Sequence, residues 1–179
     1  MVFLKLIFDL FKVLNSNKNE GEIAAGFSFG VMLALIPGGN LLWITLFVIG
    51  FFTRLNLLTA FVTLGLGKLV IGFIDPFLDT AGFYILNINA FKDFFTWLYN
   101  LPVVPYTAFN NSLVMGGFAV SLLLAFPLWF LFRKAVILYR AKVRDRIKNS
   151  RFGKAVMKLP VVGKLSTLVS TYNSLRERG

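Results

Sequence analysis

The sequence contains neither cysteine nor histidine, and it has few charged side chains. The absence of Cys and His excludes disulfides, thiol chemistry, iron–sulfur clusters, imidazole zinc sites and Ser-His-Asp catalysis. Charged residues make up 15% of the chain, against about 25% in an average soluble domain. We therefore expect a protein that is not an enzyme and that uses neither a metal ion nor a cofactor.

Apolar residues are abundant in this sequence. They make up 57% of the 179 residues and include 21 Phe, and the mean hydropathy is +0.74. So few polar side chains cannot cover a water-facing body of this size. We therefore predict an all-α integral membrane protein with broken or re-entrant helices and about two full spans.

The positive charge is concentrated at one end of the sequence. Residues 1–132 contain six Lys or Arg and six Asp or Glu, whereas residues 133–179 contain 13 Lys or Arg and two acids, which gives the net charge of +11. We interpret residues 133–179 as a basic amphipathic tail, which the positive-inside rule places in the cytoplasm. Binding to anionic phospholipids is its expected role, and docking to a partner protein is the alternative. Nucleic acid is not an expected partner.

The first 18 residues suggest a second peripheral segment. The polar residues Lys5, Asp9 and Lys12 are spaced so that they share one stripe of a helix over residues 2–14. Such a helix is too short to cross about 30 Å of hydrocarbon. Residues 1–18 are therefore predicted to form an interfacial helix and turn, or a helix packed on the membrane domain, which we place at residues 19–132.

A strong helix break interrupts the apolar stretch of residues 23–53. Pro37, Gly38, Gly39 and Asn40 separate two apolar pieces, each only about 20 Å long as a helix. Either one kinked helix crosses the membrane or two half-helices form a re-entrant hairpin from the cytoplasmic side. We favour the hairpin, because Pro and Gly disrupt a helix and Asn40 can cap the second half.

Two further apolar runs are long enough to cross. Residues 57–74 are interrupted only by Lys68, and residues 112–132 contain no charge. Between them, residues 89–111 mix aromatic side chains with Asn and Pro, and Trp97 suits the headgroup level. This segment is predicted to be an interfacial loop with a short aromatic helix.

Lys68 is the residue with the strongest indication of a function. A charge inside a span costs ~2.5–3.5 kcal/mol on insertion scales. In a structural interpretation, the Lys68 side chain reaches the membrane interface or pairs with Asp75. In a functional interpretation, Lys68 belongs to an anion site, where Lys68, Arg54 and the Gly38-Gly39-Asn40 turn converge on a phosphate, with a lipid headgroup as the ligand.

Two glycine patterns leave alternatives open. Gly26 and Gly30 form a small-xxx-small motif, which is typical of helix packing within one chain or of homodimers. The spacing from Gly26 to Pro37 recurs from Gly65 to Pro76. The recurrence is either a coincidence or a duplicated broken helix, as in transporters.

Several short motifs follow one another in a distinctive order: Ile23, Ala24, Gly26, Phe27, Gly30 and Pro37, then Arg54 and Asn56, then Pro76, then Asn110 and Asn111. Across roughly residues 10–140, this order resembles a family of small inner-membrane proteins of Gram-negative-type bacteria that is described as a domain of unknown function. This chain has Asp75 where many relatives have Asn. The resemblance implies an envelope protein and a larger envelope partner that resembles bridge-like lipid-transfer proteins.

Three functions are consistent with these features. The first is a non-enzymatic component of envelope lipid handling or lipid transport in the bacterial inner membrane, which acts with a larger partner. It requires a lateral, lipid-facing groove with a cationic end. The second is a small-solute or ion transporter, which requires a polar pathway, and only Lys68 and Asp75 offer one. The third is a structural membrane anchor. In each case the protein is multi-pass, its tail is cytoplasmic, and homo-oligomers are allowed.

Overall fold

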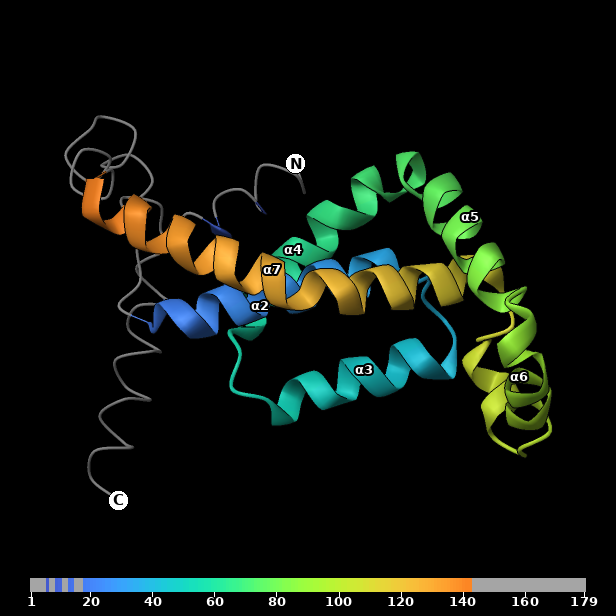
Figure 1. The fold of residues 1–179 in the computed structure, drawn as a ribbon. Helices are drawn as coiled ribbons and strands as arrows, with labels where there is room; N and C mark the ends of the chain where they lie inside the picture. Colours follow the sequence, from blue (N-terminus) through green and yellow to red (C-terminus); the bar gives the residue numbers. More distant parts are fainter. Residues whose placement is uncertain (1–5, 7–8, 11–12, 15–17, 143–179) are drawn as a thin grey trace, which may run out of the picture. The chain divides into compact units, whose positions relative to one another are not determined.

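A computed structural model describes residues 6, 9–10, 13–14 and 18–142 (Figure 1). The described elements are all helical, as predicted: α2 (Glu20–Leu35), α3 (Leu41–Phe52), α4 (Leu57–Val70), η1 (Ile71–Phe73), α5 (Asp75–Leu86), η2 (Asn89–Phe91), α6 (Lys92–Tyr99), η3 (Val104–Thr107) and α7 (Ser112–Lys142). The predicted interfacial helix lies outside the described residues except at isolated positions. The basic tail lies outside them after Lys142.

The chain divides into two compact units, Met1–Ile137 and Leu138–Gly179. The first unit contains almost all of the described structure. In the second unit, the described residues are the last turn of α7, which continues as a helix past the predicted domain boundary at residue 132.

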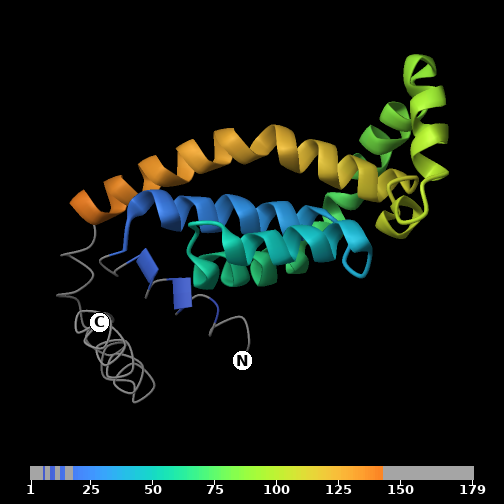
Figure 2. The same cartoon turned by 90° about the horizontal axis from the view of Figure 1, so that it is seen from below.

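The predicted helix break is confirmed, and the two pieces form a hairpin. Helix α2 ends at Ile36, and Gly39 then takes a left-handed conformation with φ +91°, which glycine adopts without steric cost. The Asn40 side chain accepts a hydrogen bond from the Trp43 backbone N–H at 2.8 Å and so caps α3. Figures 1 and 2 show α3 returning alongside α2, so a single kinked helix is excluded.

Helices α2 and α4 pack closely through small residues. The Asn56 N–H donates to the Glu22 carbonyl at 2.9 Å, which fixes the start of α4 beside the first turn of α2. A methyl group added to Gly26 or Gly30 would overlap the backbone carbonyls of Asn56 and Ala60. The small-xxx-small motif therefore serves packing within the chain, where close backbone approach needs glycine.

Helix α7 runs antiparallel to α2 and covers another side of it. Near its start, Gly117 packs against the end of α2. Farther along, the Ser28 hydroxyl donates to the Ala125 carbonyl at 2.6 Å, and the Trp129 indole donates to the Gly21 carbonyl at 3.2 Å. Helix α2 is therefore the central element, in contact with α3, α4 and α7.

The structure contains a helix long enough to cross a membrane at one of the two predicted spans, and a bent helix at the other. Within the described residues, α7 is the one helix that is long and apolar enough to cross a membrane by itself. The run predicted to cross at residues 57–74 ends at Phe73, and the chain then bends by 80° into α5. Leu57–Phe73 meets the length requirement only together with Asp75–Leu86, so it is either a broken span or a re-entrant segment. The bend brings α5 against the start of α7, where Gly82 and Gly116 allow close approach.

Candidate functional site

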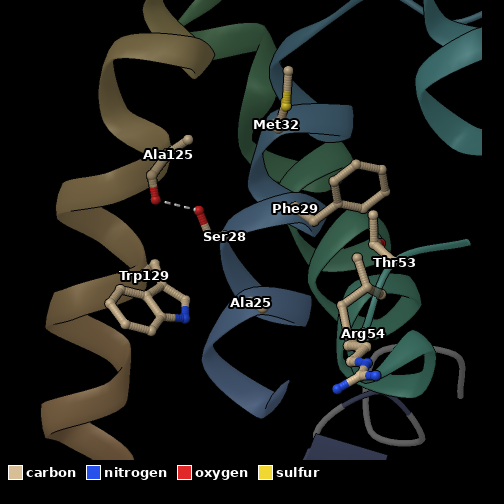
Figure 3. Close-up of a pocket in the computed structure, with 9 residues that line it drawn as sticks. Ala25, Ser28, Phe29, Met32, Thr53, Arg54, Ala125 and Trp129 are labelled. Carbon is tan, nitrogen blue, oxygen red and sulfur yellow. Dashed lines mark hydrogen bonds between the residues drawn. The ribbon is translucent and has the colours of Figure 1, made fainter. Parts of the chain in front are cut away.

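A groove of about 250 Å³ lies between α2, α7 and the linker that follows α3 (Figure 3). It is slightly smaller than the ~300–1,000 Å³ of usual ligand pockets, which leaves room for a narrow ligand. One charged residue, Arg54, lines it. The groove is formed by Ala25, Ser28, Phe29, Met32, Thr53, Arg54, Leu55, Ala125 and Trp129.

The polar side chains in the walls of the groove already have partners inside the protein. The Ser28 hydroxyl donates to Ala125 as described, and the Thr53 hydroxyl donates to the Gly50 carbonyl at 2.9 Å. The Trp129 N–H is occupied by the carbonyl of Gly21. A ligand in the groove therefore meets apolar surface along its length, and Arg54 offers it charged donors.

Arg54 lies at one end of the groove because of where α3 ends. Helix α3 ends at Phe52, and the next residues turn toward α4, whose start is tied to the first turn of α2 by the bond from Asn56 to Glu22. Figure 3 shows the guanidinium toward the Ala25 end of the groove, away from Met32. Among the described residues no acid forms an ion pair with Arg54, and its side chain is exposed. Its planar fork is therefore available to a carboxylate or phosphate.

A second cation adjoins the groove wall. The Arg133 guanidinium carbon lies 5.5 Å from the centre of the Trp129 ring, within the range of a cation–π interaction. One turn of α7 separates the two residues, so Arg133 extends beyond Trp129 toward the start of α2. Arg54 and Arg133 therefore both lie near the apolar groove, at the end of the bundle where the first turn of α2 carries Glu20 and Glu22.

Lys68 has a different role at the other end of α3. Three side chains there donate to backbone carbonyls at the end of α2, and we call them the turn clamp: Lys68 Nζ to Ile36 O at 3.0 Å, Asn40 Nδ2 to Pro37 O at 2.7 Å, and Trp43 Nε1 to Leu33 O at 3.0 Å. Carbonyls in the last turn of a helix have no intrahelical partner. The turn clamp supplies donors to them and holds the hairpin and α4 together.

The predicted convergence of Lys68, Arg54 and the Gly38-Gly39-Asn40 turn on one phosphate does not match this geometry. The structure brings Lys68 to the turn, but Arg54 lies beyond the opposite end of the 12-residue α3, which is about 18 Å long. Asn40 is engaged in capping α3 and in binding Pro37. The alternative, a direct ion pair with Asp75, is not formed in the described residues: the ammonium donates to Ile36, while Asp75 lies near enough to interact with its charge.

Sequence reasoning predicted Arg54 as one member of an anion site with Lys68, and it did not predict the walls of the groove. The walls join positions that are far apart in the chain, such as Ser28 and Ala125, which are separated by 97 positions. The available signals were weak: a hydroxyl inside the Gly26–Gly30 motif, and a Trp one turn before the first basic residue after the span. Neither signal indicates which helix faces which.

Comparison with known proteins identifies one relative. A protein of Treponema pallidum (strain Nichols), named "Uncharacterized protein", is 31% identical over 147 residues, which cover 82% of this chain and 91% of the relative. No family model matches the chain. No solved structure matches it.

Proposed function

The chain belongs to the same family as this Treponema pallidum protein, and we propose that it is a non-enzymatic, multi-pass component of envelope lipid handling in the bacterial inner membrane. The observation that carries the proposal is the groove. Its walls offer a ligand no free hydrogen-bonding group, and its end carries Arg54. Apolar walls with one cationic end match an acyl chain with an anionic headgroup.

Charge gives the proposed orientation in the membrane. The cations Arg54, Arg133 and Lys134 lie at the groove end of the helix bundle, where Glu20 and Glu22 begin α2, whereas one cation, Lys92, follows α4 among the acids Asp75, Asp79 and Asp93. The positive-inside rule then places the groove end at the cytoplasmic surface. A lipid in the groove would have its headgroup in the cytoplasmic leaflet.

Helix lengths give the proposed depth of each element. Helices α2 and α3 contain 16 and 12 residues, or about 24 and 18 Å, and neither crosses about 30 Å of hydrocarbon. We place them as a re-entrant hairpin from the cytoplasmic side, with α7 crossing beside it and α4 with α5 forming a broken span. Gly50 is the buried residue of α3, and its exposed residues Ile44, Val48 and Phe52 suit contact with lipid tails.

The turn clamp favours lipid handling over solute transport. A transporter of this size would need a polar pathway, and Lys68 was the main residue available for one. Its ammonium is bonded to the end of α2, and the groove walls are apolar. The partner we propose, on the resemblance of the motifs, is a larger envelope protein of the bridge-like lipid-transfer type that exchanges lipid with the groove.

The test is the lipid occupancy of Arg54→Gln, measured by native mass spectrometry on protein purified from a bacterial membrane. We expect bound anionic lipid to fall about three- to tenfold, because a charge-assisted bond is lost at an exposed site. The matched control is Lys92→Gln, which removes an exposed cation from α6. Equal occupancy in the two variants would contradict the proposal.

A further inference from the structure

Helix α6 has two aromatic faces with different environments. On one face, the partly buried ring of Phe95 and the half-exposed ring of Tyr99 (48%) lie 6.2 and 6.3 Å from that of the buried Phe109. The other face is exposed by about half or more, and consists of Phe94 (51%) and Trp97 (59%) of α6 together with Phe91 (50%), the last residue of η2 directly before it. The spacing of three residues places these side chains on one stripe of the helix surface.

The three tryptophans of the chain differ in how their N–H groups are used. Trp43 and Trp129 donate to carbonyls near the two ends of α2, at Leu33 and Gly21. In the part of the chain that the structure describes, the Trp97 N–H has no such acceptor. A large ring with an unused N–H is typical of the membrane–water interface, where one side of the ring meets hydrocarbon and the N–H meets polar headgroups.

The chain also fixes where α6 lies along the span. Residues 100–111, which include η3, connect α6 to α7, and Asn111 caps the start of α7 by accepting from the Val114 N–H at 3.2 Å. The same segment carries Phe109, against which α6 packs. The apolar run of α7 begins at Ser112, so α6 is held at the level where the hydrocarbon ends. Lys92 and Thr96 lie on the face of α6 opposite Phe94 and keep polar groups on its other side.

From this arrangement we propose that the Phe91–Phe94–Trp97 face of α6 inserts into the headgroup region of a lipid leaflet, on the side of the membrane opposite Arg54. The occupant of this face is the lipid surface rather than a protein. An exposed aromatic stripe at the end of a span, with an indole N–H that has no acceptor among the described residues, fits headgroups and glycerol carbonyls. The proposal does not depend on the ligand of the groove.

The absence of cysteine allows a direct test by site-directed spin labelling. Single-cysteine variants Phe94→Cys and Thr96→Cys are labelled with a nitroxide in the full-length protein, which is then reconstituted in vesicles of phosphatidylethanolamine and phosphatidylglycerol. Thr96 is the matched control, because it is exposed on the opposite face of the same helix. The measured quantity is the accessibility of each label to oxygen, which concentrates in lipid, relative to a water-soluble nickel chelate.

We expect the oxygen-to-nickel ratio at position 94 to exceed that at position 96 by roughly fivefold or more, because only one face enters the lipid. Equal ratios with high nickel access at both positions would overturn the proposal, since the helix would then lie in water. A label at position 94 that is shielded from both reagents would also overturn it, because protein would cover the face.

Discussion

The two ends of α3 place two cations in contrasting situations. At one end, Lys68 donates to the Ile36 carbonyl as part of the turn clamp. At the other end, Arg54 lies at the groove without an ion pair among the described residues. A lysine inside an apolar run attracts attention in a sequence, yet its charge is used internally. The arginine in an ordinary-looking linker is the cation that a ligand can reach.

The contrast follows from the way helix ends behave in apolar surroundings. The end of α2 leaves carbonyls without partners, and water is scarce inside a bilayer, so the chain must supply donors itself. Lys68, Asn40 and Trp43 do so at the turn. At the opposite end, the first turn of α2 leaves N–H groups rather than carbonyls without partners, so the Asn19 side chain accepts from the Gly21 N–H and the nearby Arg54 is not needed as a donor.

The largest effect is expected from a substitution that disrupts the packing of α4 against α2, on which the positions of both Lys68 and Arg54 depend. Replacing Gly26 by Leu places a side chain where the Asn56 carbonyl lies, which separates α4 from α2. We expect a loss of more than about 3 kcal/mol in the free energy of unfolding, or no folded protein. Thermal unfolding in detergent measures the effect. The control is Gly38→Ala, where the structure leaves open space, and equal stability of both variants would show that the close packing of α2 and α4 is wrong.

The next largest effect is expected from replacing Lys68, and it distinguishes a residue that stabilises the fold from one that binds a ligand. Lys68→Met leaves the Ile36 carbonyl without its donor, and we expect a loss of about 1–3 kcal/mol in the free energy of unfolding. Lipid occupancy per folded molecule should stay within the scatter of the wild-type protein. Lys68→Arg should recover part of the stability because it restores a donor. A stable Lys68→Met protein that has lost its bound lipid would instead restore Lys68 as the anion-binding residue.

The smallest effect is expected from a substitution that tests whether the hydroxyl group in the groove wall takes part in ligand binding. Ser28→Ala removes the hydroxyl that donates to Ala125, at a cost of about 0.5–1.5 kcal/mol. Lipid occupancy should not change, because the hydroxyl is already engaged inside the protein. A fall in occupancy at constant stability would mean that Ser28 contacts the ligand.

Local features of the fold could be predicted from the sequence, whereas the arrangement of helices could not. Pro37 through Asn40 indicated the break and the cap, because Pro, Gly and Asn act on the neighbouring backbone. The bend of 80° after Phe73 was not predicted in direction or size. Asp75-Pro76 marks an interruption but does not say where the next helix points.

The candidate site shows the same division. Arg54 was predicted as one member of an anion site with Lys68 and the Gly38-Gly39-Asn40 turn, and the structure does not bring these residues together. The separation of Arg54 from Lys68 depends on α3 folding back along α2, and the groove depends on Ser28 meeting Ala125 on a distant helix. Such pairings are set by packing over the whole bundle, and a single sequence does not contain them.

The most direct test of the groove is photocrosslinking with an anionic phospholipid that carries a diazirine within its acyl chain. Groove residues such as Phe29, Met32 and Ala125 should be labelled more strongly than Ile44 and Phe52 on the exposed face of α3. Filling the groove with Ala25→Phe should abolish this difference, whereas Leu123→Phe, at an α7 residue that is 75% exposed, should preserve it. Labelling that is confined to the exposed residues of α3, and that Ala25→Phe leaves unchanged, would contradict a lipid-binding groove.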